Sequence, residues 1–233
     1  TMVNVNRVLP GKRVVMLGSG NVGLIVSYQL MQAGADVVAL VEAAHKIGGY
    51  AVHAGKLRRA GVPILVGHTI TRVSGDGQVE RVEIAQVDKQ FNPIPGTERV
   101  LEADTVCLAV GLNPMTELVW MAGCKFCFIP AFGGHVPMHD SNMETTVPGL
   151  YVAGDVTGVE EASSAMEEGN LAGVCAAHAL GLLTDEQAAD KKAEINARLD
   201  ALRAGLFGER RRTAKQQQLG AMQAEQGGND HVG

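Results

Sequence analysis

The chain has 233 residues, of which 46% are apolar and 19% are charged, and its formal net charge is −5. This length is enough for one or two packed units of a globular protein, and the negative charge leaves no broad basic surface for nucleic acid. No run approaches the ~18 apolar residues of a membrane span, and the first residues lack a secretory signal pattern, so a cytoplasmic location is expected.

The first part of the chain alternates short apolar runs with helical patterns. Residues 13–17 form an apolar run before a glycine, which predicts a buried strand. Apolar positions at helical spacing over 22–33, followed by Gly34, predict a helix. The expected βαβαβ start is completed by a strand over 37–41, a helix over 51–60 and a strand over 62–66.

The middle of the chain changes character. Alternating segments over 69–74 and 79–87 are joined by Gly75-Asp76-Gly77, a strong hairpin signal, and a third strand near 99–101 would complete a meander. Residues 105–110 form another apolar run, which ends in Gly111-Leu112-Asn113-Pro114. This run predicts a further parallel strand that leads into a loop.

The last part of the chain has less regular patterns. Residues 150–153 predict a buried strand, and a run rich in small residues over 161–182 predicts a tightly packed helix. Residues 184–203 predict an amphipathic surface helix, whereas the Gln- and Gly-rich chain after Phe207 is expected to be disordered. The expected domains are 8–138, 139–183, a helical segment 184–206 and a polar tail 207–233.

A glycine-rich motif, Gly18-Ser19-Gly20-Asn21-Val22-Gly23, lies between the first strand and the first helix. In such a motif Gly18 permits a tight turn, Gly20 lets the backbone approach a pyrophosphate, and Gly23 lets helix and strand pack closely. Exposed amides at the helix N-terminus and the positive end of the helix dipole stabilise the phosphates. The alternative is a glycine turn that binds no ligand.

An acidic residue follows at the expected distance. Glu42 ends the second predicted strand 19 residues after Gly23, where a carboxylate can accept hydrogen bonds from an adenosine ribose. Glu42 would repel a 2′-phosphate, and Ala43-Ala44 offers no arginine to receive one, so NAD(H) is favoured over NADP(H). Lys46 leaves NADP(H) open, and an ordinary surface acid is the alternative for Glu42.

A second nucleotide signal is the segment Thr146-Val147-Pro148-Gly149-Leu150-Tyr151-Val152-Ala153-Gly154-Asp155. Along the chain it follows two other features: the glycine motif with Glu42, and the strand ending in Gly111-Leu112-Asn113-Pro114. The order of these three features resembles that of the pyridine nucleotide-disulfide oxidoreductase superfamily, which are flavoproteins with two dinucleotide-binding domains. The resemblance covers about residues 8–182. It implies an α/β fold: a Rossmann-like NAD-binding domain over 8–138, with a parallel sheet and a three-stranded β-meander, followed by the C-terminal part of an FAD-binding domain over 139–183.

The resemblance also implies a flavin site. After Gly154, Asp155 would bind the ribityl or pyrophosphate region of FAD, and Glu161-Ala162-Ser163 would present a helix N-terminus to the flavin pyrimidine edge. Gly111 would leave room beside the nicotinamide. A strand-end turn without a ligand is the alternative for Gly154 and Asp155. We name no catalytic side chain, because the cofactors carry the electron chemistry.

The implied reaction is hydride transfer between NAD(H) and FAD. In this family the NAD domain interrupts the flavin domain, and the short segment before Gly18 cannot hold the first flavin motif. The chain is therefore expected to be N-terminally truncated and to lack a complete FAD site by itself.

Two stretches give a finer resemblance. Gly48-Gly49-Tyr50-Ala51-Val52-His53-Ala54 and residues 160–169 are similar to the NAD/FAD subunit of dye-linked amino-acid dehydrogenases, opine oxidase and sarcosine oxidase. The alternative function is a non-catalytic dinucleotide-binding or electron-transfer subunit of a multi-subunit amino-acid or amine dehydrogenase. An oligomer and a partner dehydrogenase subunit are also expected.

Paired cysteines and histidines do not predict further chemistry. Cys124 and Cys127 have the spacing of a redox pair or of half a zinc site, but they lie downstream of the position of the redox pair in thioredoxin-reductase-like members. Inert thiols are therefore expected. His135 and His139 would face one another on a helix, but the glycines and the proline around them argue against one, and no metal site is predicted.

Overall fold

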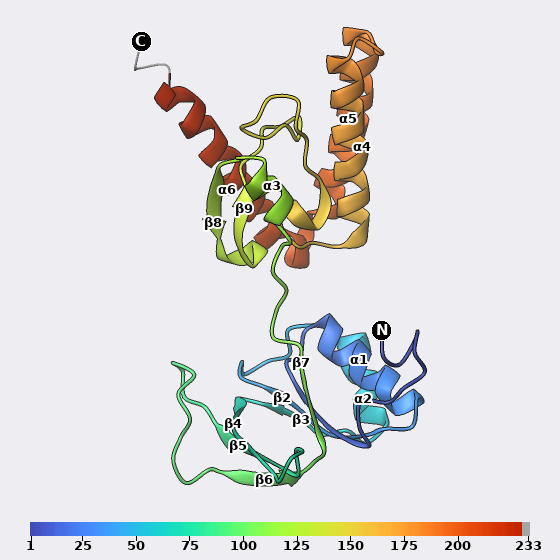
Figure 1. Cartoon of the computed structure of the whole chain (residues 1–233), viewed down its shortest axis with the longest axis vertical. Helices are drawn as coiled ribbons and strands as arrows, with labels where there is room; N and C mark the ends of the chain where they lie inside the picture. The colour runs from blue at the N-terminus through green and yellow to red at the C-terminus, as the bar shows by residue number, and fades with distance from the viewer. Residues whose placement is uncertain (230–233) are drawn as a thin grey trace. The chain divides into compact units, whose positions relative to one another are not determined.

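The computed structural model describes residues 1–229, and of residues 206, 207, 228 and 229 it describes the backbone alone (Figure 1). The chain forms two compact units, Thr1–Gly111 and Leu112–Gly233, and each is described by itself. Among the described residues, no helix combines the length and the apolarity that a membrane crossing requires.

Unit 1 is built around a four-stranded parallel sheet with the strand order β3-β2-β1-β7. The strands are β1 (Arg13–Leu17), β2 (Asp36–Glu42), β3 (Ile64–Val66) and β7 (Thr105–Leu108). Helices α1 (Asn21–Gln32) and α2 (Ala51–Arg59) follow β1 and β2. A three-stranded antiparallel sheet in the order β4-β5-β6 is inserted before β7 and consists of β4 (His68–Ser74), β5 (Arg81–Gln86) and β6 (Arg99–Glu102).

Three layers result, because successive side chains of a strand point to opposite faces of its sheet. Val14 and Met16 of β1 pack with Leu24 of α1 and Leu57 of α2 in one apolar cluster. Val15 lies on the other face, in a cluster that includes side chains of β5. The structure confirms the expected α/β fold with a parallel sheet and a meander.

Unit 2 is a smaller sheet covered by helices. It contains α3 (Glu117–Met121), the antiparallel hairpin of β8 (Phe126–Ile129) and β9 (Gly134–Pro137), and the 3-10 helices η1 (Pro130–Phe132) and η2 (Gly154–Thr157). Three longer helices follow: α4 (Ala162–Ala179), α5 (Asp185–Leu202) and α6 (Gly205–Asn229). Helices α4 and α5 lie side by side (Figure 1), and a capping box between Thr184 and Gln187 begins α5.

The two compact units meet between Gly111 and Leu112, whereas the expected domains meet at residue 138, so the domain limits stay a prediction. Residues 112–138 belong to unit 2, because their apolar side chains pack there. Val119 and Cys124 form a cluster with Val152, and Val136 of β9 packs with Ala214 of α6. The order of motifs along the chain does not reveal these contacts, since they join segments far apart in sequence.

Two elements also differ from expectation. In place of the strand expected over residues 150–153, Tyr151 makes a single bridge to Glu144, and η2 follows directly. The expected disordered tail is the helix α6 as far as Asn229, whereas residues 230–233 lie outside the described part. The buried side chains of α6 recur at helical spacing on one face and pack against the rest of unit 2, namely Ala214, Lys215, Gln218 and Met222.

Candidate dinucleotide and flavin sites

The turn between β1 and α1 carries the glycine motif and uses its three glycines differently. Gly18 has a φ of +106°, and a Cβ there would lie 2.2 Å from the carbonyl oxygen of Ala109. A Cβ on Gly23 would lie 2.1 Å from the carbonyl oxygen of Gly18. At Gly20, by contrast, no heavy atom of the described residues, apart from Gly20 and its two chain neighbours, lies within 4 Å of the place that a Cβ would take. Gly18 and Gly23 therefore permit close packing, and Gly20 leaves open space where a ligand can approach the backbone.

The N-terminus of α1 begins at this open space. Its N-cap is Gly20, and no side chain caps the helix there. The first amides of a helix have no acceptor within the helix, so those of Asn21, Val22 and Gly23 can donate to an anion. Helix α5 shows the contrasting case, since its own Thr184 side chain accepts from the amide of Gln187.

Glu42 lies at the end of β2 and holds the glycine turn. Its Oε2 accepts hydrogen bonds from the Ser19 amide at 2.8 Å and from the Ser19 hydroxyl at 2.5 Å. Its Oε1 accepts from the Ala44 amide at 2.8 Å. A carboxylate offers about four acceptor positions, so these three donors leave about one for a ribose hydroxyl. No local pattern indicates this second role, in which Glu42 joins β2 to the turn.

A loop after β2 crosses the same turn. The Gly49 amide donates to the Ser19 carbonyl at 2.8 Å, the Gly48 amide donates to the Ser19 hydroxyl at 3.0 Å, and the Tyr50 amide donates to Asn21 Oδ1 at 2.9 Å. A Cβ on Gly49 would lie 2.8 Å from the Asn21 amide nitrogen, so a side chain there has no room. The paired glycines are the signal for this close approach.

Gly111 ends unit 1 just beyond β7. It has a φ of +138°, and within the described part of the chain no heavy atom beyond its two chain neighbours lies within 4 Å of the place that a Cβ would take. The Ala109 amide donates to the Leu17 carbonyl at 2.7 Å, which holds the preceding residues beside the glycine turn. Gly111 therefore follows closely on the segment that contacts Gly18.

The second predicted site comprises η2 and the start of α4. Gly154 has a φ of +74°, and a Cβ there would lie 3.3 Å from the Cβ of Ala165, so the turn packs directly on α4. Asp155, Glu161, Ala162 and Ser163 are all exposed. The N-cap of α4 is Glu161, and no side chain caps the helix. The structure thus leaves the predicted flavin-binding residues accessible on unit 2.

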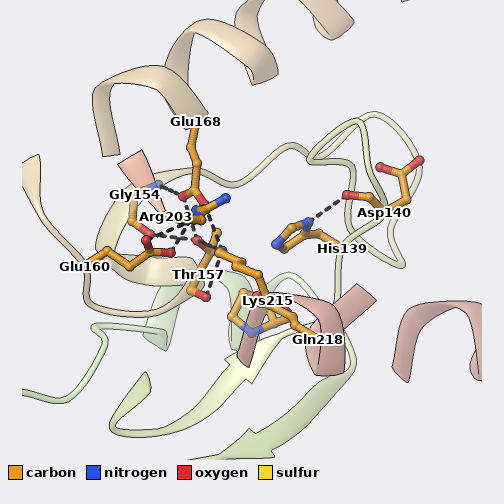
Figure 2. A network of polar contacts seen from close by, with 10 residues as sticks. His139, Asp140, Gly154, Thr157, Glu160, Glu168, Arg203, Lys215 and Gln218 are labelled. Atoms are coloured by element: carbon orange, nitrogen blue, oxygen red, sulfur yellow. Dashed lines mark hydrogen bonds and ion pairs between the residues drawn. The ribbon is translucent and has the colours of Figure 1, made fainter. Parts of the chain in front are cut away.

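Behind this exposed surface lies a buried ion cluster that no sequence pattern indicates, made of Glu160, Glu168, Arg203 and Lys215 (Figure 2). Arg203 Nη2 lies 2.8 Å from Glu160 Oε1 and 2.6 Å from Glu168 Oε1. Lys215 Nζ lies 2.9 Å from Glu168 Oε1. Each of these four side chains is 4–13% exposed. Two carboxylates and two cations balance each other in the interior.

Glu168 also binds the predicted flavin motif itself. Its Oε2 accepts from the Gly154 amide at 3.0 Å and from the Thr157 hydroxyl at 2.9 Å. Burial would raise the pKa of Glu168, but Lys215 and Arg203 outweigh burial and hold that pKa below its ordinary value. Burial lowers the pKa of Lys215, and Glu168 opposes that effect.

His139 and His135 lie in different surroundings. His139 is 2% exposed, its Nδ1 lies 2.7 Å from the Asp140 carbonyl oxygen, and its Nε2 has no hydrogen-bond partner among the described residues. Burial, and next the charge of Lys215, lower the pKa of His139 to about 4. His135 is exposed on β9, where its ring packs against Phe128. Within the described part of the chain, no group of three or more His, Cys, Asp or Glu could hold a metal ion.

The two closely spaced cysteines are free thiols within unit 2. Cys124 is buried with Val119 and Val152, and Cys127 of β8 is half-buried against the cluster that contains Ala214. Burial raises the pKa of the Cys127 thiol, which opposes formation of the reactive thiolate. Both thiols therefore contribute to packing.

Comparison with known proteins identifies relatives of this chain. The family description "Pyridine nucleotide-disulphide oxidoreductase" matches residues 2–169. A hydrogen cyanide synthase subunit of Pseudomonas aeruginosa is 27% identical over 73% of the chain and 36% of its own length. One of the opine oxidase subunits of Rhizobium meliloti is 28% identical over 76% of the chain and 42% of its own length. An NADH oxidase of Methanocaldococcus jannaschii is 26% identical over 70% of the chain and 36% of its own length.

A solved structure shows the same fold. The thioredoxin reductase of T. acidophilum is 27% identical, with a TM-score of 0.62 over 72% of this chain and 53% of that one. The chain thus spans about half of this structure, and 36–42% of the length of the three curated relatives.

Proposed function

Because the chain belongs to the pyridine nucleotide-disulphide oxidoreductase family, we propose that it takes part in hydride transfer between NAD(H) and FAD. Proteins of this family are oxidoreductases that use a flavin and a pyridine nucleotide. The observation that carries the proposal is the open space at Gly20, in a turn whose other two motif glycines are closely packed. An NAD pyrophosphate would lie there, against the amides of Asn21, Val22 and Gly23.

The second half of the proposal concerns unit 2. FAD would bind Gly154 and Asp155 and meet the start of α4 at Glu161, Ala162 and Ser163, whose side chains are exposed. The uncapped amides of α4 would stabilise negative charge on the pyrimidine edge of the ring system. The two cofactors, when bound, supply the hydride donor and acceptor. This chain binds and orients them, and Gly111 leaves space on the nicotinamide side.

Two titrations of the purified chain test this proposal. We expect calorimetry to show NADH binding, and a chain that binds no NADH would contradict the function of unit 1. Visible absorption after incubation with FAD, and removal of the free cofactor, tests unit 2. Retained flavin bands that bleach on addition of NADH would establish the complete site in this chain. A colourless protein that binds NADH would contradict FAD binding by unit 2 and support only NADH binding by unit 1.

A specific observation favours a second candidate, a non-catalytic dinucleotide-binding or electron-transfer subunit. Two of the relatives are themselves named as subunits. Helix α3 exposes three large apolar side chains, Leu118, Trp120 and Met121, which are 82%, 63% and 82% exposed. Reduction of an artificial dye by NADH and the isolated chain with added FAD would contradict this candidate. An oligomer, a partner dehydrogenase and a cytoplasmic location stay predictions of either function.

The Glu42 carboxylate predicts a preference for NADH over NADPH. Glu42→Gln removes the charge that would repel a 2′-phosphate. We therefore expect the dissociation constant for NADPH, divided by that for NADH, to fall by about tenfold. Affinity for both nucleotides should also decline, because a glutamine amide cannot accept from Ser19 and Ala44 as the carboxylate does. Calorimetric titration with each nucleotide measures the ratio. Glu98→Gln, at an exposed position of unit 1, is the matched control. An unchanged ratio would refute the role of Glu42 in selection.

A further inference from the structure

Helix α6 packs against the rest of unit 2 through a face that carries polar as well as apolar side chains. Ala214 packs in a cluster with Ile129, Phe132 and Val136. The Gln218 amide nitrogen donates to the Pro137 carbonyl at 2.8 Å. These contacts hold the middle of α6 on the β8–β9 hairpin and η1, where Lys215, the residue after Ala214, is buried.

Lys215 reaches the predicted flavin motif. Its Nζ lies 2.7 Å from the Thr157 hydroxyl, 3.3 Å from the Thr157 carbonyl oxygen and 2.9 Å from Glu168 Oε1. An ammonium group has three donors, so these three acceptors account for all of them. Figure 2 shows Lys215 and Glu168 both reaching Thr157, with Glu168 coming from α4 and Lys215 from α6.

The motif also rests on the aromatic ring that Lys215 contacts. Lys215 Nζ lies 5.2 Å from the centre of the Phe132 ring, within the range of a cation–π contact. Gly158 follows η2 with a φ of +128°, and a Cβ there would lie 2.4 Å from Phe132 Cγ. The turn therefore lies directly on Phe132, with Lys215 beside it.

The buried ion cluster joins both halves of the predicted flavin surface. Glu168 binds the Gly154 amide and the Thr157 hydroxyl, while Arg203 binds Glu168 and Glu160. Glu160 immediately precedes the N-cap of α4. A displacement within the cluster would thus move the turn and the helix start together. Buried ion pairs contribute little net stability, so a role in positioning explains such a cluster better than a role in stability.

We propose that Lys215 is a positioning residue for the flavin site: by binding Thr157 and Glu168 from behind, it holds Asp155 and the first turn of α4 in the geometry that FAD requires. This inference rests on the proposed function, because it concerns the same site. On this view FAD binding depends on helix α6 as well, although α6 lies outside the motifs that predict the flavin site.

The experiment compares four variants of the 233-residue chain with the wild type: two test variants, a control and Lys215→Arg, which restores a cation at position 215. Lys215→Met removes the ammonium and keeps an unbranched side chain of similar length. Thr157→Val removes the hydroxyl from the motif side and keeps Lys215, so it tests the same contact should the first variant fold poorly. Arg198→Met is the matched control, because Arg198 joins α4 to α5 through Glu167 without contacting η2.

The first measurement is amide hydrogen exchange of residues 154–163 in the absence of cofactor. We expect both test variants to accelerate this exchange by about tenfold, and the control by less than about twofold. We also expect Lys215→Met to weaken FAD binding by about tenfold, and Lys215→Arg to recover part of it. The visible circular dichroism of added FAD should change in Lys215→Met. NADH affinity, a property of unit 1, should stay at the wild-type value.

The outcomes separate the two proposals. Unchanged exchange over 154–163 in both test variants would overturn the inference, whatever FAD does. Accelerated exchange with wild-type FAD affinity would overturn it as well, since the contact would then be structural only. A wild-type chain that binds no FAD would contradict the proposed flavin function, while the exchange data would still decide whether Lys215 holds the turn.

Discussion

Gly18→Ala is expected to destabilise unit 1 strongly, whereas Gly20→Ala is expected to leave its stability intact and to impair NADH binding. At Gly18 the backbone has a φ of +106°, and a Cβ would meet the Ala109 carbonyl oxygen at 2.2 Å. A strained backbone and an overpacked contact each cost on the order of 1–3 kcal/mol, so the loss should reach about 3 kcal/mol or more. This is a large part of the about 5–15 kcal/mol that stabilise an ordinary domain.

Gly20 offers the matched comparison within the same turn. Its φ is −63°, which alanine adopts readily, and among the described residues only its chain neighbours lie within 4 Å of the place that the Cβ would take. The added methyl group would instead occupy the space proposed for the pyrophosphate, so NADH affinity should fall by at least about tenfold.

Urea unfolding followed by circular dichroism, together with calorimetric NADH titration, checks both glycine variants. A Gly18→Ala chain with wild-type stability would show that the turn can rearrange. A Gly20→Ala chain with wild-type NADH affinity would show that the open space does not receive the nucleotide, which would remove the main support for the proposed function.

Acid is expected to weaken unit 2 well before its carboxylates protonate, because His139 is buried in its neutral form. Its pKa is about 4 in the folded chain, against an ordinary value of 6.5, so the unfolded state binds the proton first. The stabilisation is complete above pH 6.5 and is lost as the pH falls toward 4. Between about pH 7.5 and 5 the free energy of unfolding should decrease by about 2 kcal/mol.

The groups around His139 set this behaviour. Lys215 of α6 disfavours the protonated imidazole, while Glu168 of α4 and Asp140 beside the ring favour it to a smaller extent. The pKa of Glu168 is lowered in the folded chain, so its carboxylate also stabilises unit 2. This stabilisation is complete above the ordinary pKa of 4.5 and is lost, at still lower pH, as the pH falls through the folded pKa.

Urea titrations at several pH values measure the acid effect. Trp120, the single tryptophan, lies in unit 2 beside Phe126 and reports its unfolding by fluorescence. His139→Asn removes the titrating ring and retains a donor near the Asp140 carbonyl, so its stability should vary little between about pH 7.5 and 5. An equal pH dependence in His139→Asn and in the wild-type chain would rule out His139 as the cause.

Local sequence patterns account for most of unit 1. The apolar run of β1, the helical spacing in α1 and the hairpin signal at Gly75-Asp76-Gly77 each depend on residues that are close along the chain. The glycine motif acts within a single strand–turn–helix unit, so its position and geometry followed from the residues alone. The second role of Glu42 did not, because its bonds to Ser19 span 23 residues and depend on how β1 and β2 pair.

The sequence by itself determined the α/β class, the order of the motifs and the positions of the predicted cofactor residues. Only the tertiary structure decided the limits of the two units, the helical state of residues 207–229 and the buried ion cluster. Helix α6 has a weak apolar pattern, and a lysine and a glutamine on its buried face resemble a solvated surface in sequence. They are buried because Lys215 meets Thr157, 58 residues away, and Gln218 meets Pro137, 81 residues away. Partners so distant leave no local signal, since the energy of a buried polar side chain depends on acceptors that folding alone brings near.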